Sequence, residues 1–183
     1  MGHRQLTVSR GILLGLLSFL SLSLFARGEP GEEQVKAAFV YNFAKFVEWP
    51  ESAFESKEDP MVLCIAGKDK VGAALQLLKQ RAVQGRPLHI NVLPANRDSL
   101  KNVLCHILFI ASSEEQRQQD LLAELENAPV LTVADNIEFV KQGGMISLYV
   151  EAQRVQFSIN QNATHNNGLK LSARMLQLAR IPR

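Results

Sequence analysis

Cysteine and histidine are the residues in this chain that could bind a metal or supply a nucleophile. Beyond residue 28 the chain contains two cysteines, Cys64 and Cys105, and three histidines, His89, His106 and His165. Structural zinc sites take their ligands from closely spaced pairs of such residues, and no such spacing occurs here. His106 adjoins Cys105, but neighbouring strand residues point to opposite faces, so this histidine is badly placed to activate the thiol. We therefore expect neither a metal site nor a nucleophilic cysteine.

A turn bounded by two glycines, Gly67 to Gly72, is a second candidate site. It follows a short apolar run, at the position where open α/β sheets bind phosphate. However, it lacks the ending of a P-loop and the glycine spacing of a dinucleotide fingerprint. An ordinary strand-to-helix turn is the simpler interpretation. The alternative hypothesis is a small-molecule-binding module in which Lys68 or Lys70 attracts an anion to a pocket at the strand ends.

The carboxylates do not form a recognisable catalytic pair. Glu114, Glu115, Glu124 and Glu126 lie in a polar stretch that is typical of a solvated helix. Asp135 follows a predicted strand, where active sites gather in such sheets, but a turn or a helix cap explains it more simply. The sequence also lacks the G-x-S-x-G motif of a nucleophile elbow. We interpret the chain as a binding protein rather than an enzyme, and we expect no cofactor.

The first 28 residues have the three parts of a secretory signal peptide. These are a basic start, an apolar run from Gly11 to Phe25, and the small-x-small cleavage site Ala26-Arg27-Gly28. The apolar run is shorter than the roughly 20 residues that a bilayer-spanning helix needs. We therefore predict an exported protein with a signal peptide at residues 1–28 and a single mature domain at residues 29–183.

Cleavage of that segment changes the charge of the protein. It removes three arginines and no acidic residue, so the formal net charge falls from +2 to −1. Neither a basic excess nor a run of basic residues survives, and nucleic-acid binding depends on both. We therefore expect no nucleic-acid partner.

The two cysteines of an exported protein could close into a disulfide. A loop of about 40 residues would stabilise the fold by about 4 kcal/mol, because it restricts the unfolded chain. Against this, Cys64 lies about three residues before the end of its predicted strand, whereas Cys105 lies about five or six residues before the end of its own. Parallel strands aligned at their ends would hold the two residues apart. Two alternatives therefore stay open for these cysteines: a disulfide, or two buried free thiols.

The segment VKAAFVYNFAKFVEWPE, residues 35–51, places five aromatic residues within eleven positions. Nothing from Glu32 to Glu48 breaks a helix, and the proline after Trp49 disfavours one, so we predict a helix over 32–48. Its apolar residues cover about 200° of the helix surface, with Lys36 as the one charge among them. A single sheet needs less apolar cover than that, which indicates a further layer or a partner. Tyr41 and Trp49 lie toward the other side and are candidates for a subunit or partner interface.

Strand and helix patterns alternate through the rest of the chain, which predicts a parallel sheet with helices on both faces. The turn at Ala152-Gln153 is so short that it can only join antiparallel neighbours. The predicted fold class is a three-layer α/β domain, with a mostly parallel sheet flanked by helices on both faces, closing with an antiparallel edge hairpin and a C-terminal helix. The predicted strands are residues 61–67, 88–93, 106–112, 130–133, 146–151 and 154–160, and the predicted helices are residues 71–80, 98–104, 114–127, 137–142 and 162–180.

Five segments of the chain occur in an order that resembles the YfiR family of bacterial periplasmic proteins. They are VKAAFVYNFAKFVEWPE, CHILFIASSE, PVLTVADNIEFVKQGGMISL, RVQFSINQNA and GLKLSARMLQLA, and the resemblance extends from Glu32 to Ala179. It implies a periplasmic homodimer that represses a membrane diguanylate cyclase, YfiN, by binding the periplasmic sensor part of that enzyme. Repression would lower cyclic di-GMP and biofilm output, and an outer-membrane lipoprotein, YfiB, would relieve it.

The resemblance also implies roles for particular residues. Cys64 and Cys105 are positioned like the redox-sensitive pair of the family, and Ser147 stands where a further cysteine would be expected, so a second bridge is missing. For contact with a partner, the family suggests the hairpin edge and the start of the last helix. The residues there are Met145, Ile146, Phe157, Ser158, Asn160 and Thr164.

Overall fold

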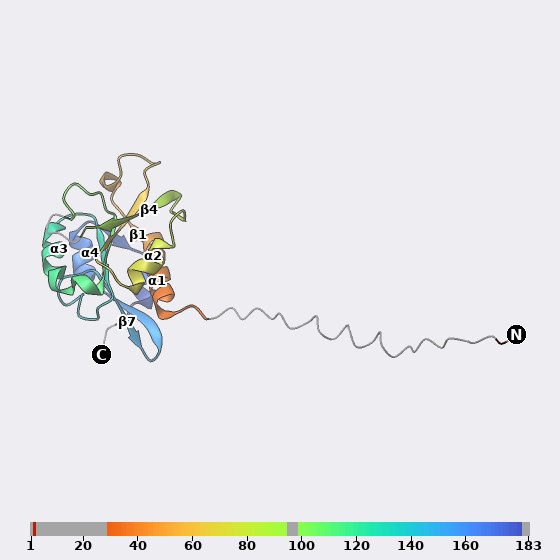
Figure 1. Cartoon of the computed structure of the whole chain (residues 1–183). Coiled ribbons are helices and arrows are strands. Elements are labelled where there is room, and N and C mark those ends of the chain that lie inside the picture. The colour runs from red at the N-terminus through yellow and green to blue at the C-terminus, as the bar shows by residue number, and fades with distance from the viewer. Residues whose placement is uncertain (1, 3–28, 95–98, 181–183) are drawn as a thin grey trace.

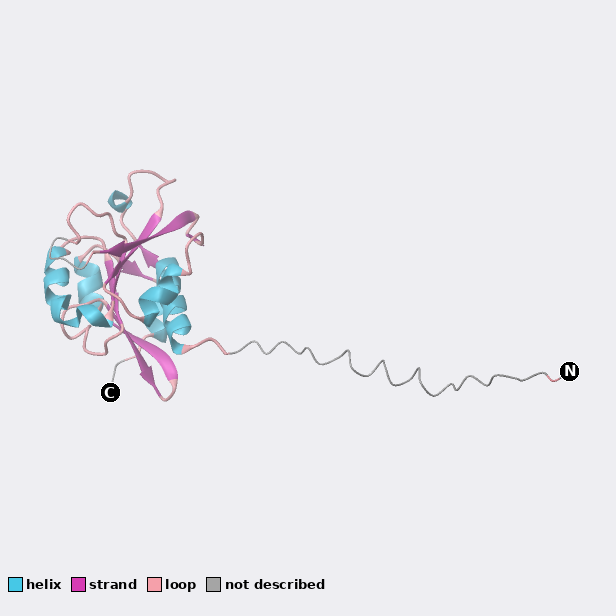
Figure 2. Cartoon of the chain, viewed as in Figure 1, coloured by secondary structure: helices cyan, strands magenta, loops and turns pink. Residues whose placement is uncertain are grey.

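The computed structural model describes residue 2 and residues 29–94 and 99–180 (Figure 1). The predicted signal peptide therefore lies outside the described residues, apart from residue 2. The described chain folds into a seven-stranded, mostly parallel sheet with helices on both sides, as Figure 2 shows. This confirms the predicted fold class. None of the helices within the described ranges is both long and apolar enough to span a bilayer.

The sheet has the spatial order β3-β4-β2-β5-β6-β7-β8. The five central strands are parallel, whereas β3 and β8 pair antiparallel to their neighbours at the two edges. The chain order reverses between β2 and β5, so the carboxyl ends of these strands form the switch point of the sheet. The strands are β2 (Met61–Ala66), β3 (Ala82–Val83), β4 (Arg86–Leu93), β5 (Ile107–Ile110), β6 (Leu131–Ala134), β7 (Ile146–Glu151) and β8 (Arg154–Ile159).

The central strands are buried on both faces, as their continuous apolar runs predict. Every residue of β2, β5 and β6 is buried. Alternate side chains contribute to two separate apolar clusters, one on each face of the sheet. We call these the first face, which α1 (Glu32–Phe46) covers, and the second face, which α3 (Gln118–Glu124) covers. Figure 1 shows the two helices on opposite sides of the sheet.

Helix α1 ends two residues earlier than predicted, because Val47 and Glu48 form a short strand, β1. This strand pairs antiparallel with β9 (Lys170–Leu171), far away in the sequence. Gln84 closes the end of the helix, since its Nε2 donates to the carbonyls of Ala44 at 3.0 Å and Val47 at 2.8 Å. The helix α2 (Lys70–Gln76) packs beside α1 on the first face.

The prediction of one continuous C-terminal helix over residues 162–180 is wrong. The segment forms α4 (Gln161–Asn166), then β9, then α5 (Ala173–Leu178). Gly168 interrupts the helix with a positive φ of 73°, which favours glycine. Ser172 then caps α5, since its side chain accepts the N–H of Met175. The helical periodicity on both sides of this break made it look continuous.

Helices are shorter than predicted on the second face. Residues 112–117 form a 3-10 turn, η2 (Ser112–Arg117), before α3 begins, and the predicted helix at 137–142 is a series of turns. The predicted helix at 98–104 lies partly outside the described residues, and its described part is also turn and loop. A further short 3-10 turn, η1 (Glu51–Ala53), follows β1.

Candidate functional site

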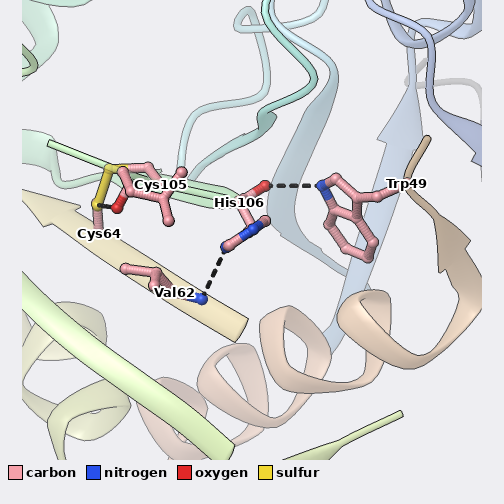
Figure 3. Close-up of a disulfide and its surroundings, with 6 residues drawn as sticks. Trp49, Val62, Cys64, Cys105 and His106 are labelled. Atoms are coloured by element: carbon pink, nitrogen blue, oxygen red, sulfur yellow. Dashed lines mark hydrogen bonds between the residues drawn. A yellow bond between two sulfur atoms is a disulfide. The ribbon is translucent and has the colours of Figure 1, made fainter. Parts of the chain in front are cut away.

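Cys64 and Cys105 form a disulfide that joins β2 to the segment just before β5 (Figure 3). Both residues are buried, and their Cα atoms are 5.8 Å apart. Because Leu63 pairs with Ile107, a regular strand would place Cys105 beside Met61, about 10 Å along the sheet from Cys64. The chain instead leaves the strand path before β5, and Cys105 lies over the second face. The aligned-strand argument against a disulfide was therefore wrong.

His106 lies beside the disulfide but has a structural role. Its Nδ1 accepts the backbone N–H of Val62 at 3.0 Å, which places the proton on Nε2, 2.9 Å from the carbonyl oxygen of Ala53. Phe54 stacks on the ring with centroids 4.3 Å apart. Burial lowers the pKa of His106 below its usual 6.5, the Ala53 carbonyl opposes this shift, and the charge of Arg86 lowers the pKa further. The histidine is therefore neutral and fixed on both nitrogens.

Tyr41 and Trp49, the candidate interface aromatics, are both half-buried. The Nε1 of Trp49 donates to the carbonyl oxygen of His106 at 3.2 Å, as Figure 3 shows. The hydroxyl of Tyr41 donates to the carbonyl oxygen of Ala82 at 2.8 Å, and Lys45 lies over its ring. Both polar groups therefore have partners within the chain, and an interface role for these residues stays a prediction.

Lys36 and Asp135 form an ion pair that the sequence pattern did not predict. The Nζ of Lys36, a buried residue of α1, lies 2.6 Å from Asp135 at the end of β6 and 2.5 Å from Glu32. Burial alone would lower the pKa of Lys36, but hydrogen bonds to Asp135 and Glu32 outweigh it and raise the pKa above 10.5. The only signal in the sequence was a single charge within an apolar helix face. The pair ties α1 to the carboxyl edge of the sheet.

The turn from Gly67 to Gly72 lies between β2 and α2, at the switch point of the sheet, and two of its backbone N–H groups have partners. Lys68 donates its N–H to Ser113 Oγ at 2.9 Å. Asp69 caps α2 by accepting the N–H of Gly72 at 2.6 Å, and its other oxygen accepts the N–H of Ser112 at 3.0 Å. Gly67 has a φ of 84°, and a side chain there would collide with η2. The turn is therefore packed against η2, while the side chains of Lys68 and Lys70 are exposed.

The carboxyl edge of the sheet contains a small cavity of about 170 Å³ beside the ends of β5 and β6. Pockets for metabolites are usually about 300 to 1,000 Å³, so this one is too small for most of them. Within the described residues, no three histidine, cysteine, aspartate or glutamate side chains are grouped as metal ligands. The cavity is lined on its polar side by Ser112, Glu115, Gln118, Asp135 and Asn136.

The six partner-contact candidates come together around the β7–β8 hairpin and α4, mostly inside the fold. Asn160 is half-buried and caps α4, since its Oδ1 accepts the N–H of Ala163 at 3.0 Å. Phe157 packs on α1, with its ring centroid 5.0 Å from that of Phe43. Direct contact of these six side chains with a partner stays a prediction. The buried five are Met145, Ile146, Phe157, Ser158 and Thr164.

Taken together, the fold and the disulfide define a compact α/β domain of a kind suited to an oxidising compartment. A family model described as YfiR/HmsC-like matches residues 33–180, most of the chain. The protein therefore belongs to the YfiR/HmsC-like family, which confirms the resemblance found in the sequence. This is a regulatory family of periplasmic proteins that act in cyclic di-GMP signalling, not a family of catalysts.

Proposed function

We propose that this protein is a non-enzymatic periplasmic repressor of an inner-membrane diguanylate cyclase. It binds the periplasmic sensor part of the cyclase and thereby lowers cyclic di-GMP and biofilm output. The observation that carries this proposal is the family match over residues 33–180, which takes in nearly every element from α1 to α5. The homodimer and the YfiB-like lipoprotein partner remain predictions from the same resemblance.

Repression of this kind requires that the protein binds the inactive state of the cyclase more tightly than the active state. Moving an equilibrium from 99:1 to 1:99 needs a preference of about 10⁴-fold. Stable protein interfaces usually bury about 1,600 Å² in total. The cyclase would therefore contact a broad surface of this protein rather than a single side chain.

The outer side of the β7–β8 hairpin is the surface that we propose for the cyclase. There the hairpin and the start of α1 form a groove of about 620 Å³. Val150 on the hairpin is 45% exposed. The buried candidates Ile146 and Phe157 belong to the same two strands as Val150 and Val155. The groove, which we call the hairpin groove, is lined by Pro30, Glu32, Val35, Val150, Gln153, Arg154 and Val155.

The alternative function, a small-molecule-binding module at Gly67 to Gly72, has no specific observation in its favour. Ser113 and Asp69 already accept the N–H groups of Lys68 and Gly72. A thermal shift against a metabolite panel would revive this alternative if a metabolite raised the melting temperature.

The proposal can be tested by deleting the gene in its native host and measuring cellular cyclic di-GMP. We expect the level to rise, and the full chain to restore it. A chain without residues 1–28 should fail to restore it, because it would not be exported. Val150→Glu should also fail, whereas Leu178→Glu, at a similarly exposed apolar position on α5, should succeed. An unchanged cyclic di-GMP level in the deletion strain would contradict the proposal.

A further inference from the structure

One edge strand of the sheet, β4, is unpaired along most of its outer side. The short strand β3 pairs with β4 only at Arg86 and Pro87, the first two residues of β4. One further bond follows, in which the carbonyl oxygen of Arg81 accepts the N–H of Leu88 at 2.8 Å. From that point to Leu93, β4 pairs with β2 alone among the residues that the structure describes. We call this stretch, residues 88–93, the open edge.

The open edge presents backbone groups that are suited to another strand. In a strand, successive residues direct their N–H and C=O groups alternately to the two sides. Because the N–H of Leu88 points outward to Arg81, those of Ile90 and Val92 also point outward. Within the described residues, nothing bonds to these groups on that side. A strand added here would gain hydrogen bonds without displacing any existing ones.

At the opposite edge of the sheet, the chain after α5 bonds to the outer side of β8 at one point among the described residues. There, the N–H of Arg180 donates to the carbonyl oxygen of Phe157 in β8 at 2.8 Å. Natural proteins usually shield edges with proline, charged side chains or bulges, because bare edges recruit other strands. Residues 88–93 have the sequence LHINVL, without a proline, lysine or arginine. Val92 in addition leaves 47% of its surface exposed.

The surroundings of the open edge indicate what would bind there. A groove of about 680 Å³ follows the first half of β4, and Lys79 and Arg81 line it. No aspartate or glutamate is among the described residues that line this groove. An added strand that carries acidic side chains would therefore complement it.

A second copy of this chain fits the open edge less well. Pairing of two β4 strands would present LHINVL, which has no acidic residue, to the groove of each partner. Lys79 and Arg81 of both copies would then lie in one interface without compensating charge.

We propose that the open edge of β4 binds an extended, acidic segment of another protein as an added strand. This inference goes beyond the proposed function and does not depend on it, because the open edge belongs to β4 and the hairpin groove to β7 and β8.

The test uses the purified protein and two fluorescein-labelled peptides of about seven residues, a typical strand length. One peptide alternates valine and glutamate, and the other has lysine in place of every glutamate. Fluorescence anisotropy measures the binding of each. We expect the acidic peptide to bind at least about tenfold more tightly than the basic one at low salt, with the difference falling as salt is added.

Two variants at one position test whether binding occurs by strand addition. Val92→Pro removes an outward N–H but no bond to β2, and it should weaken binding of the acidic peptide about tenfold. Val92→Thr keeps that N–H and should bind within about twofold of the native protein. Circular dichroism and melting temperatures check that both variants fold.

Three results would overturn the inference. The first is that neither peptide binds, and the second is that Val92→Pro binds the acidic peptide as the native protein does. The third is that the native protein sediments as a dimer that Val92→Pro converts to a monomer, since the open edge would then be occupied by a second copy.

Discussion

Helix α1 gives the first face of the sheet a continuous apolar cover, whereas α3 and a series of turns cover the second face. On the first face, α1 has 15 residues, and its aromatic side chains pack directly on the hairpin. The rings of Phe39, Phe43 and Phe157 have centroids 5.0 to 6.0 Å apart. Such contacts stabilise the face through buried area and ring packing.

The second face has less helix and more specific bonds. Helix α3 has seven residues, and the chain from 136 to 143 covers much of the rest as turns. Ser147 Oγ accepts the N–H of Val140 at 3.1 Å and lies 3.3 Å from the carbonyl oxygen of Ile137. The disulfide fixes the chain before β5 on the same face. Where helical cover is short, covalent and hydrogen bonds hold the loops in place.

Removal of the disulfide should have the largest effect on stability and should test how far the second face depends on it. Cys64 and Cys105 are 41 positions apart, and opening a loop of that size should cost about 4 kcal/mol. Urea unfolding of the oxidised and reduced protein measures the difference, and the double variant Cys64→Ser, Cys105→Ser should match the reduced protein. Equal unfolding midpoints in the oxidised and reduced states would contradict this view of the second face.

The Lys36–Asp135 pair tests whether the first face depends on more than apolar contact. Asp135→Asn removes one of the two acidic partners of a buried ammonium group and should lower the free energy of unfolding by about 2 kcal/mol, because Glu32 still pairs with Lys36. Asp120→Asn, at an exposed carboxylate on α3, should change it by less than about 0.5 kcal/mol. Adding Lys36→Met to Asp135→Asn should recover part of the loss, because the buried ammonium group, which then has Glu32 as its remaining acidic partner, is gone. Equal unfolding free energies for Asp135→Asn and Asp120→Asn would show that the pair contributes little.

His106 lies between β2 and η1. Protonation of this histidine should give the smallest of the three effects on stability, seen as a dependence of the free energy of unfolding on pH. Because its pKa is lowered on folding, the unfolded chain binds more protons near pH 6 than the folded protein does. The contribution of His106 to the free energy of unfolding is therefore fully present above pH 6.5 and is lost as the pH falls below that value. Denaturant midpoints at pH 7.5 and 5.5, about one unit on either side of the usual pKa, measure this.

The contribution of His106 can be separated from that of the other histidines. His106→Gln keeps a donor and an acceptor but does not titrate, so it should flatten the pH dependence. His89→Gln, at an exposed histidine of β4, should leave the dependence unchanged. If both variants behaved alike, the pH dependence would have another source.

The strand pattern could be predicted from the sequence because buried parallel strands are continuous apolar runs. Residues 61–67 and 130–133, for example, closely match β2 and β6. The break of the C-terminal helix had local signals in Gly168 and Ser172, but the pairing of β9 with β1, about 120 residues earlier in the chain, could not be predicted. Local periodicity carries no information about such pairing.

The site was harder to predict for the same reason. The disulfide depends on the path of the chain before β5, and spacing in the sequence left it open. The partner of Lys36 is 99 residues away, so only the unusual presence of a charge within an apolar helix face indicated that a partner existed. The hairpin candidates came from the family resemblance, and the structure adds that five of the six are buried.

The central claim is that this protein regulates a diguanylate cyclase by binding its periplasmic part. It is tested most directly by adding the purified protein to the periplasmic side of membrane vesicles that contain the diguanylate cyclase encoded nearest to its gene. Cyclic di-GMP synthesis on the cytoplasmic side is then measured as the protein is titrated. The account predicts a saturable fall in synthesis that Val150→Glu abolishes and Leu178→Glu preserves. Synthesis that stays constant at saturating protein, with no binding to the cyclase, would contradict it.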